Sequence, residues 1–427
     1  MIKLYNFDEL KPEEILNRDI RAEKNVEDVV DGIIADVRAR GDEALKDYAL
    51  KFDGAVIENL QVTQEEIDEA FAGMDPYFLE TLRQAAANIE NFHRQQVHKN
   101  FVVNDKPGIV LGQKYTPIEK AGVYVPGGTA AYPSTVLMDV IPAKVAGVSE
   151  IVMTTPAGKD GKVNPVILAA AATAGVTKIF KTGGAQAVAA LAYGTQTIPA
   201  VDKIVGPGNA FVAAAKKLAF GTVDIDMIAG PSEVLVLADD SANPEWLAAD
   251  MLSQAEHGAD SQAVLVCRTV AFARRVNDAL RRQTAVSPRN AILRESLAQS
   301  RIVVFDSQDD MLDFAEAYAP EHLIVSLRDP WPAARRITTA GSVFVGDYAP
   351  ESAGDYASGT NHTLPTGGCA RAYSGVNIDS FLRRITYQEL TREGLRALAP
   401  TVVAMARAEG LDAHAEAVRI RLEGGVR

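Results

Sequence analysis

The chain has 427 residues, of which 47% are hydrophobic and 23% are charged, and its formal net charge is −13. That acidic balance excludes a general nucleic-acid binder, because phosphate contacts need a concentrated basic face, and no apolar run is long enough to span a membrane. The two cysteines, Cys267 and Cys369, cannot build a disulfide framework, and the first residues lack the apolar core of a signal peptide, so we expect a cytoplasmic protein.

The N-terminal quarter is predicted to be a polar arm followed by a helical layer. Residues 1–20 are mixed and polar with little to bury, which is typical of an arm. Asn25 is a favourable N-cap, and valines and isoleucines recur behind it at helical spacing up to Val37. Further helices are predicted over residues 42–52, 63–74 and 75–93.

Beyond Tyr115, short apolar runs alternate with helical segments, which predicts parallel βαβ units. One set of strands is predicted at 122–128, where the run enters a glycine turn, and at 151–153, 178–180 and 203–205. A second set is predicted at 234–237, 263–266, 302–305, 323–326 and 343–345. From about Phe381 the charged sequence predicts helix to the end, as a tail that needs a partner surface.

We therefore predict an α/β protein with two Rossmann-like parallel-sheet domains, an N-terminal helical arm and a C-terminal helical tail. The predicted boundaries place the arm at 1–20, one discontinuous α/β domain at 21–115 plus 236–375, the other at 116–235, and the tail at 376–427.

Three glycine turns follow predicted strands, at Gly127-Gly128, Gly183-Gly184 and Gly206-Pro207-Gly208. Backbone N–H groups at the start of a helix suit phosphate, whereas the alternative is that the glycines only permit tight turns. None of the turns matches the G-x-G-x-x-G dinucleotide fingerprint. Residues beside the turns that could contact a nucleotide are Tyr124, Gln186 and Asn209.

Two short polar clusters carry an imidazole. Gln254 and His257 are three residues apart at the end of a predicted helix, on one face, where an amide oxygen and an imidazole can begin a metal or substrate site. Glu321 and His322 precede a strand, and an acid beside an imidazole suits proton transfer. The alternatives are a hydrogen-bonded structural histidine in the first cluster and a turn-capping Glu321 in the second.

Two further segments add candidate ligands. Residues 351–362 are small and polar without apolar periodicity, which predicts a loop that either lines a site or is disordered. If it lines a site, it offers Asp355 as a hard metal ligand. Residues 409–414 contain His414, at what would otherwise be a solvated helix end. Gln254, His257, Asp355 and His414 are together compatible with zinc, although their wide spacing is not a zinc motif.

Over nearly its whole length, and in order, the sequence resembles the histidinol dehydrogenase family. The segments that carry the resemblance are Gly183-Gly184-Ala185-Gln186-Ala187, Gly206-Pro207-Gly208-Asn209-Ala210-Phe211, Ala229-Gly230-Pro231-Ser232-Glu233, Gln254-Ala255-Glu256-His257-Gly258, Pro320-Glu321-His322-Leu323, the run from Ser352 to His362, and Ala408-Glu409-Gly410-Leu411-Asp412-Ala413-His414.

The resemblance implies oxidation of L-histidinol to L-histidine through histidinal, with two NAD+ consumed. It implies that zinc is held by Gln254, His257, Asp355 and His414, and that these four residues also contact the substrate. It implies further substrate contacts at Ser232, His322 and Glu409. It implies NAD contacts at Tyr124, Gln186 and Asn209. It also implies a homodimer in which the tail reaches the partner's site, so that Glu409 and His414 come from the other subunit. His362 is expected to support the metal ligands without binding the ion itself.

The implied chemistry assigns His322 as the base in both hydride transfers and Glu321 as the base that activates water to attack the aldehyde. A rival route through a thiohemiacetal stays open for Cys369, whereas Cys267 sits in an apolar run that predicts core. Two other functions are weighed: oxidation of another small alcohol, such as a sulfonated diol, by the same fold and metal site, and metal binding without catalysis. Glu321 and His322 beside the ligand set speak against the second.

Overall fold

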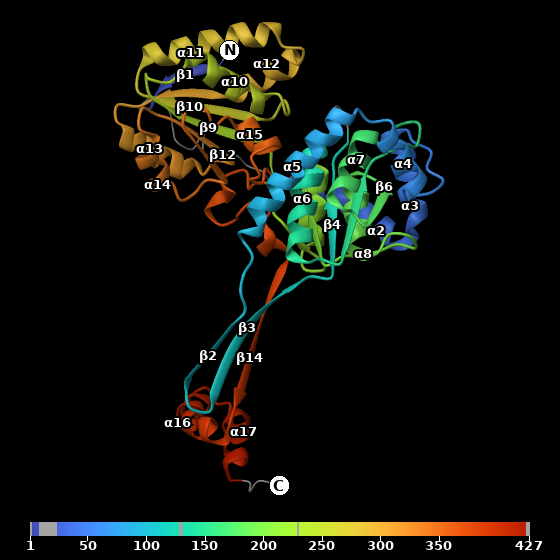
Figure 1. Cartoon of the computed structure of the whole chain (residues 1–427), viewed down its shortest axis with the longest axis vertical. Helices are drawn as coiled ribbons and strands as arrows, with labels where there is room; N and C mark the ends of the chain where they lie inside the picture. The colour runs from blue at the N-terminus through green and yellow to red at the C-terminus, as the bar shows by residue number, and fades with distance from the viewer. Residues whose placement is uncertain (1, 8–23, 128–130, 229, 424–427) are drawn as a thin grey trace. The chain divides into compact units, whose positions relative to one another are not determined.

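The computed structural model of the chain describes residues 2–7, 24–127, 131–228 and 230–423, so most of the predicted arm, Gly128 and Ala229 lie outside the described residues. Contacts divide the chain into two units, Met1–Gln96 with Ile118–Phe381, and Val97–Pro117 with Leu382–Arg427. The first unit contains two parallel sheets covered by helices, which confirms the predicted α/β class (Figure 1).

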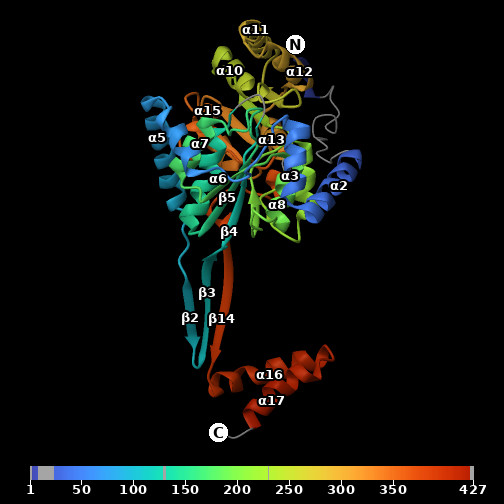
Figure 2. The same cartoon turned by 90° about the vertical axis from the view of Figure 1, so that its right-hand side faces the viewer.

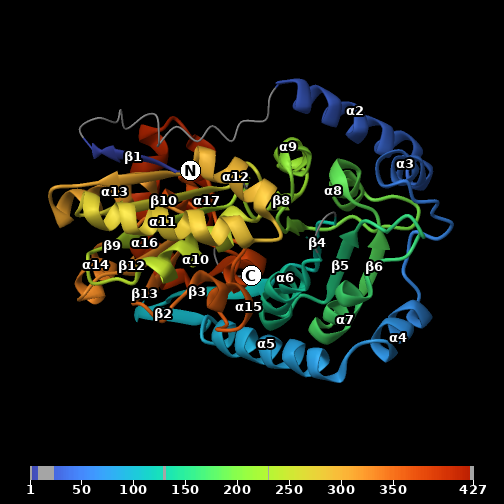
Figure 3. The same cartoon turned by 90° about the horizontal axis from the view of Figure 1, so that it is seen from above.

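The first sheet of unit 1 has five parallel strands. In spatial order they are β6 (Lys178–Lys181), β5 (Glu150–Thr155), β4 (Lys120–Tyr124), β7 (Lys203–Val205) and β8 (Asp224–Ile225). One face carries α4 (Gln64–Ala72), α5 (Pro76–Arg94), α6 (Pro133–Ala146) and α7 (Pro165–Ala174), and the other carries α2 (Lys24–Arg40), α3 (Asp42–Tyr48), α8 (Gly184–Tyr193) and α9 (Ala210–Ala219) (Figure 3). Both faces of β5 are therefore buried, with Ile151 and Met153 in one core and Val152 in the other, which explains its unbroken apolar run.

The N-terminal helices form largely where the sequence predicts them. Thr63 caps α4 in a reciprocal capping box with Glu66, and Asp75 caps α5, whose first residue is a proline. These helices pack on the five-stranded sheet, since the apolar stripe of α2 joins the core around α8 and α9, and Ile89 of α5 joins the core around α6. This packing differs from the expectation that residues 21–115 belong with 236–375.

The second sheet of unit 1 has six parallel strands. In spatial order they are β1 (Lys3–Asn6), β11 (Arg301–Val304), β10 (Gln262–Cys267), β9 (Glu233–Ala238), β12 (His322–Ser326) and β13 (Ser342–Val345). The helices on one face are α10 (Pro244–Ala255), α11 (Val270–Val286) and α12 (Asn290–Gln299), and those on the other are α13 (Gln308–Tyr318) and α14 (Pro330–Arg336) (Figure 1). Val234 and Leu235 of β9 point to opposite cores, as the two-residue strand period requires.

Strand β1 corrects the prediction of a polar arm with little to bury. Its residues pair in parallel with β11, Tyr5 lying opposite Val303, and the ring of Phe7 stacks on Phe305 with centroids 4.6 Å apart. Ile2 is also buried in the core of this sheet. The few apolar residues at the start of the chain are therefore enough to complete one sheet edge.

Unit 2 combines a three-stranded antiparallel sheet with two helices (Figure 2). Its strands are β14 (Leu382–Leu390), β3 (Ile109–Pro117) and β2 (Phe101–Lys106), followed by α16 (Arg392–Ala408) and α17 (Asp412–Glu423). The prediction of helix from Phe381 onwards is wrong for β14, because the β-forming residues Ile385, Thr386 and Tyr387 pair with β3 along its whole length. Among the described residues, no helix has both the length and the apolar character needed to cross a membrane.

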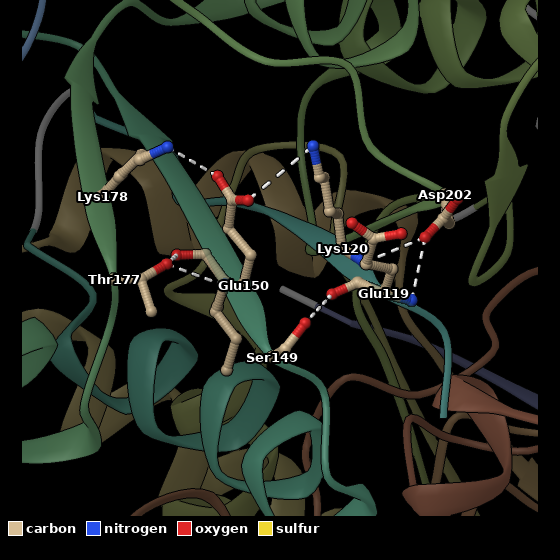
Figure 4. Close-up of polar contacts among 8 residues, drawn as sticks. Glu119, Lys120, Ser149, Glu150, Thr177, Lys178 and Asp202 are labelled. Atoms are coloured by element: carbon tan, nitrogen blue, oxygen red, sulfur yellow. Dashed lines mark hydrogen bonds and ion pairs between the residues drawn. The ribbon is translucent and has the colours of Figure 1, made fainter. Parts of the chain in front are cut away.

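At the amino ends of the strands in the five-stranded sheet, side chains connect neighbouring strands to one another (Figure 4). Asp202, just before β7, accepts hydrogen bonds from the backbone N–H groups of Glu119 and Lys120, at 3.0 and 2.9 Å. Glu150 of β5 pairs with Lys178 of β6 at 2.8 Å and with Lys120 of β4 at 3.8 Å. These contacts tie together the starts of β4, β5, β6 and β7.

Candidate active site

The residues predicted beside a nucleotide lie at the carboxyl ends of the five-stranded sheet. After β4, the chain forms β5 and β6 on one side of β4, and then crosses to the other side of β4 to form β7 and β8. The strand order therefore reverses between β4 and β7, which is where open α/β sheets bind ligands. Tyr124 ends β4, Asn209 caps α9 after β7, and Gln186 lies in the first turn of α8 after β6.

Local geometry accounts for the glycine after β7. Gly206 has φ of 120°, and a Cβ atom there would lie 2.1 Å from the carbonyl oxygen of Tyr124, so any side chain would clash with the backbone of β4. The Tyr124 hydroxyl accepts a hydrogen bond from the Gly184 N–H at 3.1 Å, and burial raises the pKa of this tyrosine to about 12. Asn209 Oδ1 accepts from the N–H groups of Phe211 and Val212. The glycines thus serve tight turns, and phosphate binding stays a prediction.

The second group of predicted residues lies at the amino ends of β9 and β12, which are neighbours in the six-stranded sheet. Glu321 immediately precedes β12, and its Oε2 accepts hydrogen bonds from the Glu233 N–H at 2.8 Å and from Gln254 Nε2 at 3.3 Å. Ser232 immediately precedes β9 and is half-buried. This cluster lies at the sheet edge opposite to the one that open α/β sheets ordinarily use.

His322 is the first residue of β12, and its side chain is almost fully buried. Its Nδ1 lies 3.3 Å from the backbone carbonyl of Glu233, and since a carbonyl only accepts, this nitrogen carries the proton in that contact. The lone pair of the neutral ring is then on Nε2, which lies 3.6 Å from Asp355 Oδ1. Burial lowers the pKa of His322, but the carboxylates of Glu351, Glu321 and Asp355 outweigh it and raise the pKa well above the ordinary value.

Two acids on helix α15 (Glu351–Tyr356) face His322. The prediction of a loop at 351–362 is therefore wrong for 351–356, whereas residues 357–362 form no helix or strand. Glu351 and Asp355 are four residues apart and so share a helix face, and His322, Glu351 and Asp355 each offer an atom within 4.8 Å of the others. Burial, then the neighbouring acids, raise the pKa of Glu351 to about 8 against the opposing effect of His322. Burial also acts to raise the pKa of Asp355, but His322 lowers it overall.

Several buried atoms around this cluster have no hydrogen-bond partner among the described residues. They are Gln254 Oε1, His322 Nε2, Asp355 Oδ1, both carboxyl oxygens of Glu351, and His362 Nε2. Gln254 is fully buried, and because its Nε2 donates to Glu321, its oxygen is the atom left unpaired. His257 lies just beyond α10, is exposed, and is close enough for its charge to lower the pKa of Asp355. Desolvation lowers the pKa of His362.

Unit 1 therefore brings together Gln254, His257, Glu321, His322 and Asp355. Glu409 and His414 belong to unit 2, where Glu409 caps the end of α16 and His414 lies in α17, both exposed. Their place relative to the cluster stays a prediction from the family resemblance.

The two cysteines differ in what they could contribute. Cys267 is fully buried at the carboxyl end of β10, away from the strand ends that carry the cluster, and burial raises its pKa to about 12. A thiolate nucleophile at this position is therefore disfavoured. Cys369 is half-buried in a short 3₁₀ turn, Cys369–Arg371.

Sequence reasoning gave no role to Glu351. The spacing of Glu351 and Asp355 contained the signal, because residues four apart meet on one face of a helix, but the small polar residues around them predicted a loop. Glu233 was likewise not singled out, although its backbone orients both Glu321 and His322.

Known proteins were compared with the whole chain. The sequence model of the histidinol dehydrogenase family matches residues 16–422. A histidinol dehydrogenase of Methanothermobacter thermautotrophicus is 48% identical over 426 residues, covering 99% of both chains, and one of Bacteroides fragilis is 51% identical over 411 residues, covering 96% of both. The crystal structure of histidinol dehydrogenase from Elizabethkingia anophelis superposes with a TM-score of 0.95 at 43% identity, covering 99% of this chain and 98% of that one.

Proposed function

The chain belongs to the histidinol dehydrogenase family, and we propose that it oxidises L-histidinol to L-histidine by two NAD-dependent hydride transfers at a zinc site built around Asp355. Membership makes it an oxidoreductase of histidine biosynthesis. The proposal rests on a set of buried nitrogen and oxygen atoms that have no hydrogen-bond partner among the described residues. They lie beside Glu321 and His322 at the amino ends of β9 and β12.

The donor set suits zinc. A buried polar atom without a partner costs free energy, so Gln254 Oε1 and Asp355 Oδ1 are best explained by a ligand that they hold together. Zinc accepts imidazole nitrogen and carboxylate oxygen, and His257 adds an accessible imidazole next to them. We assign the ion to Gln254, His257 and Asp355, with His414 as the fourth protein ligand. When bound, the ion would anchor the substrate through its nitrogen atoms.

NAD is proposed to bind at the reversal point between β4 and β7. Tyr124, Gln186 and Asn209 each sit where a strand of this sheet gives way to a turn or helix. In open α/β sheets, ligands bind at the point where the strand order reverses, which in this sheet lies between β4 and β7.

His322 is proposed as the base in both oxidations. In the neutral form of His322, with Nδ1 donating to the Glu233 carbonyl, Nε2 takes the hydroxyl proton while hydride passes from the carbon that bears the hydroxyl to NAD+. This leaves the aldehyde, NADH and a protonated His322, which releases its proton to solvent before the second oxidation. Water then adds to the aldehyde to give a hydrate. His322 takes a hydrate proton as the second hydride leaves, which yields the acid and a second NADH.

Glu321 is proposed to activate the water that attacks the aldehyde. Hydrogen bonds from the Glu233 backbone and Gln254 hold its Oε2, and so fix the direction of the whole carboxyl group. Its neighbour His322 is reserved for the alcohol and hydrate protons, so the two adjacent residues divide the proton transfers between them.

The tail is proposed to complete the site of a second copy of the chain. Unit 2 has apolar side chains that no described residue covers, which favours a protein partner. They include Val102, Leu111, Ile385, Met405 and Ile420.

A substrate panel tests the proposed function. The purified protein is stripped with a chelator, reloaded with zinc, and assayed for NADH formation with L-histidinol, simple alcohols and a sulfonated diol. We expect kcat/KM for histidinol to exceed the others by about a hundredfold or more, since unmatched polar groups in the site penalise other substrates. Equal or greater activity on the sulfonated diol would assign the same site to another alcohol, and no activity on any alcohol would favour metal binding without catalysis.

A further inference from the structure

Two groups of buried polar side chains lie within unit 1, one at the glycine turn after β7 and the other at the segment that follows Asp355. Their members come from α6, α9, the residue after β8, and the stretch 361–367. They are Asp139, Lys216, Asp226, Asn361 and Thr363.

At the glycine turn after β7, a buried ion pair forms hydrogen bonds with the backbone of Gly206. Lys216 of α9 pairs with Asp226, and the side chains are 3% and 1% exposed. Lys216 Nζ also donates to the Gly206 carbonyl at 3.0 Å, while the Gly206 N–H donates to Asp226 Oδ2 at 2.8 Å. Both backbone groups of this glycine are therefore held by one buried pair.

In the second group, α6 holds the segment that follows the candidate metal ligands. Thr363 Oγ1 donates to Asp139 Oδ1 at 2.9 Å, and Asn361 Nδ2 donates to the backbone carbonyl of Met138 at 2.6 Å. A few residues later, the Gly367 N–H donates to Glu233 Oε1 at 3.0 Å, at the start of β9. The stretch 361–367 thus runs from α6 to the strand end that orients His322.

Asp139 lies on α6, which packs on the five-stranded sheet, and it accepts the hydrogen bond that fixes Thr363. It is fully buried, and burial together with the negative charge of Asp226 raises its pKa to about 8, against opposing effects of Thr363 and Lys216. Because Lys216 and Asp226 already balance each other, an ionised Asp139 would add an uncompensated buried charge. Burying a carboxyl group in this place costs free energy, so packing alone does not explain the presence of Asp139.

We propose that Asp139 and Thr363 are positioning residues, which fix the stretch 361–367 to α6 of the five-stranded sheet and so align the substrate, held beside β9 and β12, with the nucleotide proposed to bind at the five-stranded sheet. The proposal rests on the function proposed above. Neither residue touches the reacting atoms, so their loss affects the alignment of bound reactants rather than the binding of either one. A displacement of about 1 Å at a reacting centre can lower a rate by about a hundredfold.

Three variants of the full-length, zinc-loaded protein test the link. Thr363→Val keeps the side-chain shape but removes the hydroxyl, Thr363→Ser keeps the hydroxyl, and Thr173→Val removes a half-buried hydroxyl that donates to Ala169 within α7. We expect Thr363→Val to lower kcat about tenfold or more, with KM for histidinol, KM for NAD+ and bound zinc within about twofold of the parent. We expect Thr363→Ser and Thr173→Val to retain kcat.

Each other outcome overturns the proposal in a recognisable way. Equal kcat for Thr363→Val and the parent, with only a lower melting temperature, would make the link purely structural. Loss of zinc or a change confined to one KM would assign it to binding, and an equal loss in Thr173→Val would make the effect unspecific. If the parent protein itself forms no NADH from histidinol, the proposed function fails first and this inference falls with it.

Discussion

At the residue scale, Glu321 and His322 are neighbours in sequence but are held by different groups. His322 is oriented by the Glu233 carbonyl, whereas Glu321 is oriented by the Glu233 N–H and the Gln254 amide. One residue of β9 therefore sets the geometry of both. The adjacent acid and imidazole can take separate proton transfers because each has its own fixed hydrogen-bond partners.

Glu321→Gln is expected to impair the second oxidation more than the first. Glutamine can still accept the hydrogen bond from the Glu233 N–H, so the fold of the site is kept, but it cannot take a proton from water. A general base contributes about 10²–10⁴-fold, which sets the scale of the loss. Single-turnover NADH formation from histidinol and from histidinal measures the two steps separately, and an equal loss in both would contradict the division of roles.

The metal assignment is tested by two substitutions near Asp355. His257→Ala is expected to lower bound zinc to well below one ion per subunit, because it removes a proposed ligand. Glu351→Gln is expected to retain zinc, although Glu351, His322 and Asp355 are the acidic and imidazole side chains whose atoms lie within 4.8 Å of one another. Elemental analysis after dialysis measures the bound zinc. Loss of zinc from Glu351→Gln but not from His257→Ala would assign the ion to the group formed by Glu351, His322 and Asp355.

Residue type alone predicts Gln254, His257 and Asp355 as possible ligands. The fold links Gln254 to Glu321 by a hydrogen bond and places His257 close enough to Asp355 for a charge interaction, and the role of these residues as ligands stays a prediction. Residue type alone does not predict a role for Glu351 or Asp139, because an acid in the sequence gives no sign of being buried. That property exists only after α15 and α6 are packed against their neighbours.

At the element scale, secondary structure follows the local sequence in the two parallel sheets. The predicted strands overlap β4 to β7 and β9 to β13, because both faces of each sheet are covered and the apolar runs are continuous. Strands β2, β3 and β14 are not predicted, because the apolar runs in β2 and β3 are only three residues long and the side chains of β2 and β14 are mostly exposed. β2 and β3 pair as neighbours in the sequence, whereas β14 becomes a strand by pairing with a segment far away along the chain.

Asp202 provides an element-scale prediction at the sheet edge shown in Figure 4. Asp202→Ala removes the acceptor for the N–H groups of Glu119 and Lys120, so we expect a loss of about 1 kcal/mol in the free energy of unfolding. Asp202→Asn keeps an oxygen acceptor and is expected to lose less. Urea unfolding compares the two variants, and an equal loss in both would show that charge, not hydrogen bonding, stabilises this edge.

At the scale of the whole molecule, the proposed zinc ligands lie on both units of the chain, and the proposed homodimer would bring unit 2 of one copy to the site of the other. Sequence predicted the two parallel-sheet domains, and the family comparisons agree over the full length. The arrangement of units within a dimer depends on contacts between copies, which no pattern within one sequence encodes.

Hybrid dimers test whether the site is shared. His257→Ala and His414→Ala are each expected to be inactive as homodimers. When the two variants are co-expressed, a shared site predicts that hybrid dimers regain one intact site, or about a quarter of parental activity in a random mixture. If the mixture stays inactive although hybrid dimers form, His414 serves its own subunit or neither site.

The most direct measurement of the central claim is the yield of NADH from a limiting amount of L-histidinol with excess NAD+. We expect two NADH per histidinol, with the yield abolished by a chelator and restored by zinc. One NADH per histidinol would mean that the reaction stops at the aldehyde and would contradict the role given to Glu321. No NADH at all would contradict the proposed reaction.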